Sequence, residues 1–107
     1  MTKEVTTANF TDILKEKNIT VIDFWAPWCG PCKMLLPVID ELSVDNEGKD
    51  VTIAKINVDE YGEIAQQLGV RGVPTVMFFK DGVEVKENRI VGYKPKSEFQ
   101  KVIEGML

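Results

Sequence analysis

Apolar residues recur at the three- and four-residue spacing of a helix in four parts of the chain, namely around residues 10–14, 34–42, 64–68 and 99–106. The second of these helices should be the longest and reach about Asn46. Pro37 lies inside it and is expected to kink it, because proline removes one amide donor and crowds the preceding turn. We expect Gly69 to close the third helix and Ser97 to cap the fourth.

Three other segments are apolar on both alternating faces, which predicts buried strands at 19–26, 51–59 and 74–79. A Lys-Asp-Gly turn at 80–82 leads into 83–92, so the last of these strands should form a hairpin with the segment that follows. A short first strand is also expected around Val5. Because strands and helices alternate, the pattern predicts an α/β fold. We expect a three-layer α/β/α sandwich around a mixed sheet, formed by a single domain over residues 1–107.

Composition narrows the possible functions. The chain has 17 acidic and 13 basic residues and a net charge of −4, which disfavours a nucleic-acid partner. No apolar run is long enough to cross a bilayer, and the first residues lack the apolar core of a secretion signal, so we expect a cytoplasmic protein. Histidine is absent, which removes the commonest metal ligand and general base.

The only two cysteines, Cys29 and Cys32, lie within the stretch W-A-P-W-C-G-P-C. Such a pair can be a structural disulfide, half of a metal site or a redox centre. A disulfide that closes so short a loop would add only about 2 kcal/mol of stability. A zinc site needs about four ligands, which two cysteines without histidine cannot supply. An inert buried pair remains open, although Trp28 and Pro31 would suit a core poorly.

The position of the pair favours redox chemistry. Cys29 directly follows a predicted buried strand, and Cys32 is expected to open the long helix. Free amides and a partial positive charge at a helix start stabilise a thiolate, and Pro31 suits a first helical turn. Positions three apart in a helix are close enough for a disulfide to form and open with small adjustments. The chain has no glycine-rich dinucleotide fingerprint, so we expect no bound cofactor.

Two charged residues interrupt the predicted buried strands. Asp23 lies within Val-Ile-Asp-Phe-Trp-Ala, where burial should raise its pKa, and it is the best candidate to exchange a proton with Cys32. An ordinary surface acid on an edge strand remains the alternative. Lys55 on the neighbouring strand either pairs with Asp23 or extends to solvent. Pro74 begins a strand, which by itself does not indicate a cis or a trans peptide bond.

Several motifs follow one another along the chain: W-A-P-W-C-G-P-C, a proline-bearing helix, K-I-N-V-D, R-G-V-P-T, F-K-D-G and V-G-Y. With these motifs the chain resembles the thioredoxin family over essentially its whole length. The resemblance implies a thioredoxin fold with a five-stranded sheet in the order 1-3-2-4-5 and four helices. It also implies a single-domain protein-disulfide reductase rather than a multidomain isomerase. The chain departs from the family pattern at Tyr93, where a smaller residue is common, and at Leu35-Leu36.

The resemblance also implies roles for individual residues. Cys29 would be the exposed nucleophile that attacks a client disulfide, and Cys32 would resolve the mixed disulfide. Asp23 would accept the proton of Cys32, with Lys55 beside it. The residues implied in client docking and redox tuning are Trp28, Gly30, Pro31, Val73, Pro74 and Gly92, with a cis peptide bond between Val73 and Pro74. The Gly30-Pro31 pair is typical of reductants in this family.

The implied partners are client proteins with disulfides and a thioredoxin reductase, which uses NADPH and a flavin, or a ferredoxin-linked equivalent. The protein itself would be a monomer with no bound cofactor, no metal, and no nucleic-acid or membrane partner. Two alternatives stay open at this point. One is a disulfide oxidase or isomerase, which a markedly oxidising reduction potential would indicate. The other is a binding module whose groove recruits a partner.

Overall fold

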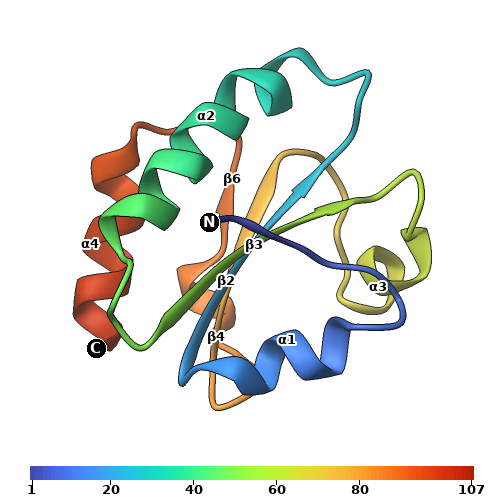
Figure 1. Cartoon of the computed structure of the whole chain (residues 1–107). Helices are drawn as coiled ribbons and strands as arrows, with labels where there is room; N and C mark the ends of the chain where they lie inside the picture. The colour runs from blue at the N-terminus through green and yellow to red at the C-terminus, as the bar shows by residue number, and fades with distance from the viewer.

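The computed structural model describes residues 1–107 as one mixed sheet with helices on both faces (Figure 1). The elements in chain order are β1 (Lys3–Glu4), α1 (Phe10–Glu16), β2 (Ile19–Trp25), α2 (Gly30–Asp45), β3 (Val51–Asn57), α3 (Gly62–Gln67), β4 (Thr75–Lys80), β5 (Val83–Glu84), a 3₁₀ turn (Lys86–Asn88), β6 (Ile90–Val91) and α4 (Lys96–Met106). None of these helices is both long and apolar enough to cross a membrane.

The strand order is β1-β3-β2-β4-β5, which confirms the expected topology. β1 and β2 run parallel to β3 on either side of it, whereas β4 runs antiparallel to β2. β2 is therefore a central strand that is paired along its whole length. Its carboxyl end lies where the chain turns into α2, so this end of the sheet carries the cysteines (Figure 1).

The fifth strand differs from the expectation, because the segment 83–92 does not pair continuously with β4. It forms two short strands, β5 and β6, that both pair with β4 and are separated by the 3₁₀ turn. In this turn the amides of Asn88 and Arg89 donate to the carbonyls of Val85 and Lys86, so the ladder is interrupted by local hydrogen bonds. The polar run Lys86-Glu87-Asn88 has little preference for a strand, which favours the interruption.

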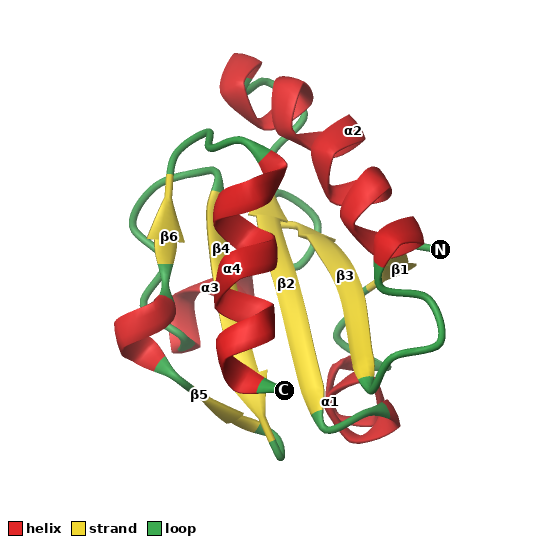
Figure 2. Ribbon diagram, turned by 90° about the vertical axis from the view of Figure 1, so that its left-hand side faces the viewer, coloured by secondary structure: helices red, strands yellow, loops and turns green.

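Two apolar cores lie on opposite faces of the sheet. Alternate residues of β2 divide between them: Val21 faces α2 and α4, whereas Ile22 faces α1 and α3. Figures 1 and 2 show these two helix pairs on the two sides of the sheet, which confirms the three-layer arrangement. Because side chains alternate along a strand, a single central strand anchors both cores and fixes α2 over the face that carries Val21.

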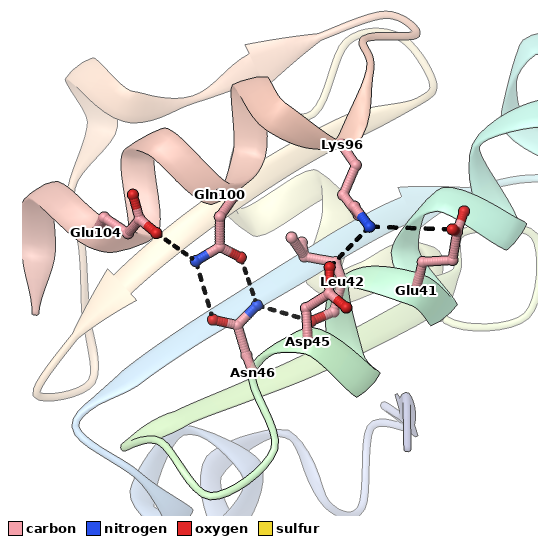
Figure 3. A network of polar contacts seen from close by, with 7 residues as sticks. All are labelled: Glu41, Leu42, Asp45, Asn46, Lys96, Gln100 and Glu104. Atoms are coloured by element: carbon pink, nitrogen blue, oxygen red, sulfur yellow. Dashed lines mark hydrogen bonds and ion pairs between the residues drawn. The ribbon is translucent and has the colours of Figure 1, made fainter.

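Polar contacts join the C-terminal end of α2 to α4 (Figure 3). The buried Asn46 donates from Nδ2 to the carbonyl of Leu42 at 2.7 Å and to Oε1 of Gln100 at 2.8 Å, and it accepts from Nε2 of Gln100 at 3.3 Å. At the start of α4, Lys96 forms an ion pair with Asp45 at 2.7 Å. These contacts hold α2 at the end opposite to the cysteines.

The helix ends follow the sequence expectations in part. Gly69 lies just beyond the last residue of α3 with a φ of 74°, a conformation that favours glycine, so it closes the helix as expected. Ser97 does not cap α4, because the helix already begins at Lys96 after Pro95, and no side chain caps it. Pro95 is the N-cap residue and has extended backbone, with a φ of −69° and a ψ of 156°. α2 continues across Pro37 without a break.

Candidate redox site

Cys29 and Cys32 lie at the start of α2, where they are joined by a disulfide with their Cα atoms 5.2 Å apart. The helix begins at Gly30, two residues earlier than the sequence suggested, so Cys29 is its N-cap and Cys32 lies within the first turn. Pro31 is the second helical residue, a position where its missing amide costs nothing. The amide of Cys32 donates to Sγ of Cys29 at 3.2 Å. A helix amide and the helix dipole therefore act on the sulfur of Cys29.

Access to the two sulfurs is unequal. Cys29 keeps 5% of its surface exposed, whereas Cys32 is fully covered. The description of Cys29 as an exposed nucleophile is therefore too strong. The pair packs against Ala26 with Trp25, Val58 and Val73 around it, and these side chains leave only a small opening. A reagent from solvent can meet the pair only through Cys29.

The segment from Val73 to Pro74 lies against the cysteines. The carbonyl oxygen of Val73 is 3.7 Å from Sγ of Cys29, and the Val73–Pro74 peptide bond is cis, which confirms that expectation. The next carbonyl, of Pro74, accepts the amide of Gly92 at 2.8 Å. Gly92 has a φ of 93°, which a side chain would disfavour. Residues far apart in the sequence thus form one continuous backbone surface beside Cys29.

Trp28 is an exposed apolar side chain of the site. Its side chain is 70% exposed, and its Nε1 donates to Oδ1 of Asp59 at 3.3 Å. The amide of Asp59 in turn donates to the side chain of Asn57 at 2.9 Å. No role was expected for Asp59 from the sequence. Its position in the sequence could have indicated the contact with Trp28, because Asp59 follows β3, which runs parallel to β2. The carboxyl ends of parallel strands share one edge of the sheet.

Asp23 is buried in the central strand β2, which excludes the interpretation as a surface acid on an edge strand. By strand alternation it lies on the face of Val21 and Trp25, beneath α2. Neither carboxyl oxygen has a hydrogen-bond partner in the protein. Burial raises the pKa of Asp23 from 3.8 to about 7, and the positive charge of Lys55 lowers it in part.

Lys55 is the direct cross-strand neighbour of Asp23 on β3, and Glu4 on β1 is its neighbour on the other side. Its Nζ lies 3.9 Å from Oε1 of Glu4, and its side chain is 22% exposed. It forms no ion pair with Asp23, so of the two arrangements left open by the sequence it adopts the outward one. Its charge nevertheless acts on the carboxyl group of Asp23. No group of three metal-binding side chains is present.

The sequence and the fold were compared with known proteins. A family model described as thioredoxin matches residues 1–105. The chain belongs to the thioredoxin family. It is 44% identical to a thioredoxin of Synechocystis over 99% of this chain and 97% of the relative, and 48% identical to a thioredoxin of Chlorobaculum thiosulfatiphilum over 94% and 92%.

Solved thioredoxin structures have the same fold. A mutant thioredoxin from Halobacterium salinarum is 38% identical and superposes with a TM-score of 0.86, covering 96% of this chain and 88% of that one. The thioredoxin of Malassezia sympodialis gives the same identity and TM-score over 98% and 90%. Thioredoxins are thiol–disulfide oxidoreductases that need no bound cofactor. The disulfide of Cys29 and Cys32 at the active-site position gives this member the dithiol chemistry of a protein-disulfide reductase.

Proposed function

We propose that the reduced protein transfers two electrons to disulfides of client proteins, with Cys29 as the nucleophile and Cys32 as the resolving thiol. The observation that carries these roles is the unequal access of the two sulfurs, since only Cys29 keeps any exposed surface. The amide of Cys32 and the start of α2 stabilise negative charge on Sγ of Cys29, which is the form that attacks a disulfide.

The reaction then consists of two exchanges. The thiolate of Cys29 attacks one sulfur of the client disulfide, so that a mixed disulfide forms and the other client sulfur leaves as a thiolate that takes up a proton. Cys32 loses its proton and attacks Sγ of Cys29, which releases the second client thiolate and leaves the disulfide between Cys29 and Cys32. One client disulfide has been reduced, and one dithiol of the protein has been oxidised.

Asp23 is the proposed acceptor of the Cys32 proton. It is buried on the face of β2 that lies beneath α2, and it has no competing hydrogen-bond partner. Its pKa of about 7 suits a base that must accept and return a proton near neutral pH. Lys55 acts indirectly in this proposal, because its charge keeps the pKa of Asp23 from rising further.

The client segment is proposed to pair with the backbone of Val73 as an added strand. The exposed ring of Trp28 and the backbone around Gly92 would border the docked segment. Pro74 would hold this backbone in place from a buried position rather than touch the client directly. Gly30 and Pro31, both exposed beside the pair, would leave room for the client and set the balance toward reduction.

The oxidised protein must be returned to the dithiol form. We expect a thioredoxin reductase to do this with electrons from NADPH through a flavin, or a ferredoxin-linked equivalent. A cytoplasmic location and a monomeric state are part of the same proposal. The cytoplasm is a reducing compartment, which keeps such cysteine pairs in the dithiol form.

Substitution of the cysteines tests the proposal. With dithiothreitol as the electron source, Cys29→Ser should reduce insulin disulfides no faster than dithiothreitol alone, because the remaining thiol of Cys32 is fully covered. Cys32→Ser that has been reduced and then freed of dithiothreitol should instead accumulate mixed disulfides with insulin chains, visible by mass spectrometry, because the second exchange is blocked. Ser43→Ala, a conservative change near the C-terminal end of α2 and remote from the cysteines, serves as the control and should keep full activity. Insulin reduction by Cys29→Ser faster than by dithiothreitol alone would contradict the assignment, and a markedly oxidising reduction potential would contradict the reductase direction.

A further inference from the structure

A cavity of about 380 Å³ opens beside the proposed client-docking segment. One wall is the loop that leads from α3 to β4, and the other is β6, which lies beside β4 in Figure 2. The lining residues are Gly69, Arg71, Gly72, Thr75, Arg89 and Val91. The lining contains two arginines and no acid. The cavity is therefore next to Val73 and carries basic side chains.

One of the two arginines is fully engaged. Nε and Nη2 of Arg89 donate to the two carboxyl oxygens of Glu84 at 2.9 and 2.7 Å, and Nη2 also donates to the carbonyl of Leu68 at 2.9 Å. The side chain of Glu84 is only 6% exposed, so this acid is turned to Arg89 and away from solvent. Arg89 thus fixes the shape of the cavity by tying β6 to the end of α3, and its charge is neutralised.

Arg71 is the other arginine, and its charge is free. It is exposed, forms no ion pair and donates no hydrogen bond to the protein. It lies two residues before Val73, whose carbonyl faces Sγ of Cys29. The loop between them is held in place, because the hydroxyl of Thr75 donates to the carbonyl of Gly72 at 2.7 Å. A fixed loop therefore presents one unmatched guanidinium at the edge of the docking surface.

We propose that this cavity is a specificity subsite that accepts an aspartate or glutamate side chain of the docked client. The inference rests on the proposed function, because it needs a client segment paired with Val73. A guanidinium offers two parallel donors to a carboxylate, and a docked chain that excludes water would strengthen the pair. Clients with an acidic residue near the attacked cysteine are thus preferred over clients with a neutral or basic residue there.

Symmetric disulfide-linked dimers of a short cysteine peptide provide the test. Members of the set differ only in one residue near the cysteine, which is Glu, Gln or Lys at each flanking position in turn. Their reduction is followed by chromatography of the released peptide. The protein should reduce the best-placed Glu peptide about three- to fivefold faster in kcat/KM than its Gln counterpart. High salt should diminish this preference, because it screens an exposed ion pair.

Variants at Arg71 identify the source of the preference. Arg71→Gln should abolish the preference for Glu without slowing the Gln peptide, Arg71→Glu should invert it in favour of Lys, and Arg71→Lys should keep part of it. Lys17→Gln is the matched control: it removes one exposed charge near the start of β2, at the end of the strand remote from the cysteines. This control should keep the full preference.

The possible failures are distinguishable. Equal rates for the Glu and Gln peptides at every position, or a preference that survives Arg71→Gln, would overturn the subsite and leave the reductase function intact. A preference lost equally in Lys17→Gln would also overturn it, because the net charge would then be the cause. No reduction of the Gln peptide would overturn the proposed function itself.

Discussion

Asp23 combines complete burial with an ionisable group that lacks a hydrogen-bond partner. A carboxyl group in this environment stays protonated until the pH approaches its pKa of about 7, whereas in the unfolded chain it ionises near 3.8. Between these values the folded state binds the additional proton. The contribution of Asp23 to the free energy of unfolding should therefore be highest below about pH 4 and fall as the pH rises to about 7.

This decrease of the unfolding free energy with rising pH can be tested by substitution of Asp23. Asp23→Asn keeps the size of the side chain but cannot ionise, so it should remove the decrease and make the protein more stable than the parent by about 2–4 kcal/mol at pH 8. Urea unfolding at pH 5 and pH 8 gives the comparison. Asp12→Asn, an exposed acid on α1, is the control and should follow the parent. An Asp23→Asn variant with the parent's slope would show that Asp23 is not the titrating group.

The roles of single residues were partly visible in the sequence. The buried position of Asp23 followed from the apolar residues on both sides of it, and the cysteines followed from their spacing. The direction of the Lys55 side chain did not follow from the sequence, because it depends on Glu4 of β1. Glu4 lies beside Lys55 only through the register of the parallel strands β1 and β3. Asp59 was missed although it follows β3, whose carboxyl end shares one edge of the sheet with that of β2, and Trp28 follows β2.

At the level of elements, the hydrophobic pattern predicted all four helices and the three long strands. These elements each bury a regular stripe or face, so their periodicity is strong. The segment 83–92 was predicted less well, as one strand instead of two. Its interruption is stabilised by the ion pair of Glu84 with Arg89 and by the carbonyl of Leu68 at the end of α3. A contact with a distant helix leaves no trace in local periodicity.

The polar junction between α2 and α4 leads to a stability prediction. Asn46→Ala would remove the side-chain hydrogen bonds to Gln100 and to the carbonyl of Leu42, which should cost about 1–3 kcal/mol of unfolding free energy. The backbone amide at position 46 still donates to Leu42, and Gln100 still donates to Glu104. Gln67→Ala removes an exposed amide on α3 and should change the stability by less than about 0.5 kcal/mol. Urea unfolding compares the two variants. Equal losses of stability in Asn46→Ala and Gln67→Ala would show that the junction does not stabilise the packing of α2 against α4.

Asn46→Ala also tests whether the junction affects the redox reaction in addition to the stability of the fold. The junction lies at the end of α2 opposite to Cys29, and it contacts no residue of the redox site. Insulin reduction by Asn46→Ala at a temperature where it is folded should therefore match the parent. A slower reaction by the folded variant would mean that the junction also sets the position of the first turn of α2.

The whole molecule is as compact as a single domain of its length. Its radius of gyration is 12.3 Å, and about 13 Å is expected for one domain of this size. Both apolar cores take residues from β2 and from β4, so neither core can form without the central strands. We therefore propose that residues 1–107 fold as one cooperative unit.

This proposal predicts that damage to either core weakens the entire molecule. Leu42→Ala opens a cavity in the core under α2, and Ile56→Ala does so in the core on the other face; each should cost about 2–5 kcal/mol. Urea unfolding is followed by far-UV circular dichroism, which reports all helices, and by the fluorescence of Trp25 and Trp28 beside the cysteines. In each variant the two signals should move together to a lower midpoint, because the strands shared by the cores couple them. If Ile56→Ala lowered the midpoint of the dichroism alone, the two faces would unfold separately, and the redox site would depend only on the core beneath α2.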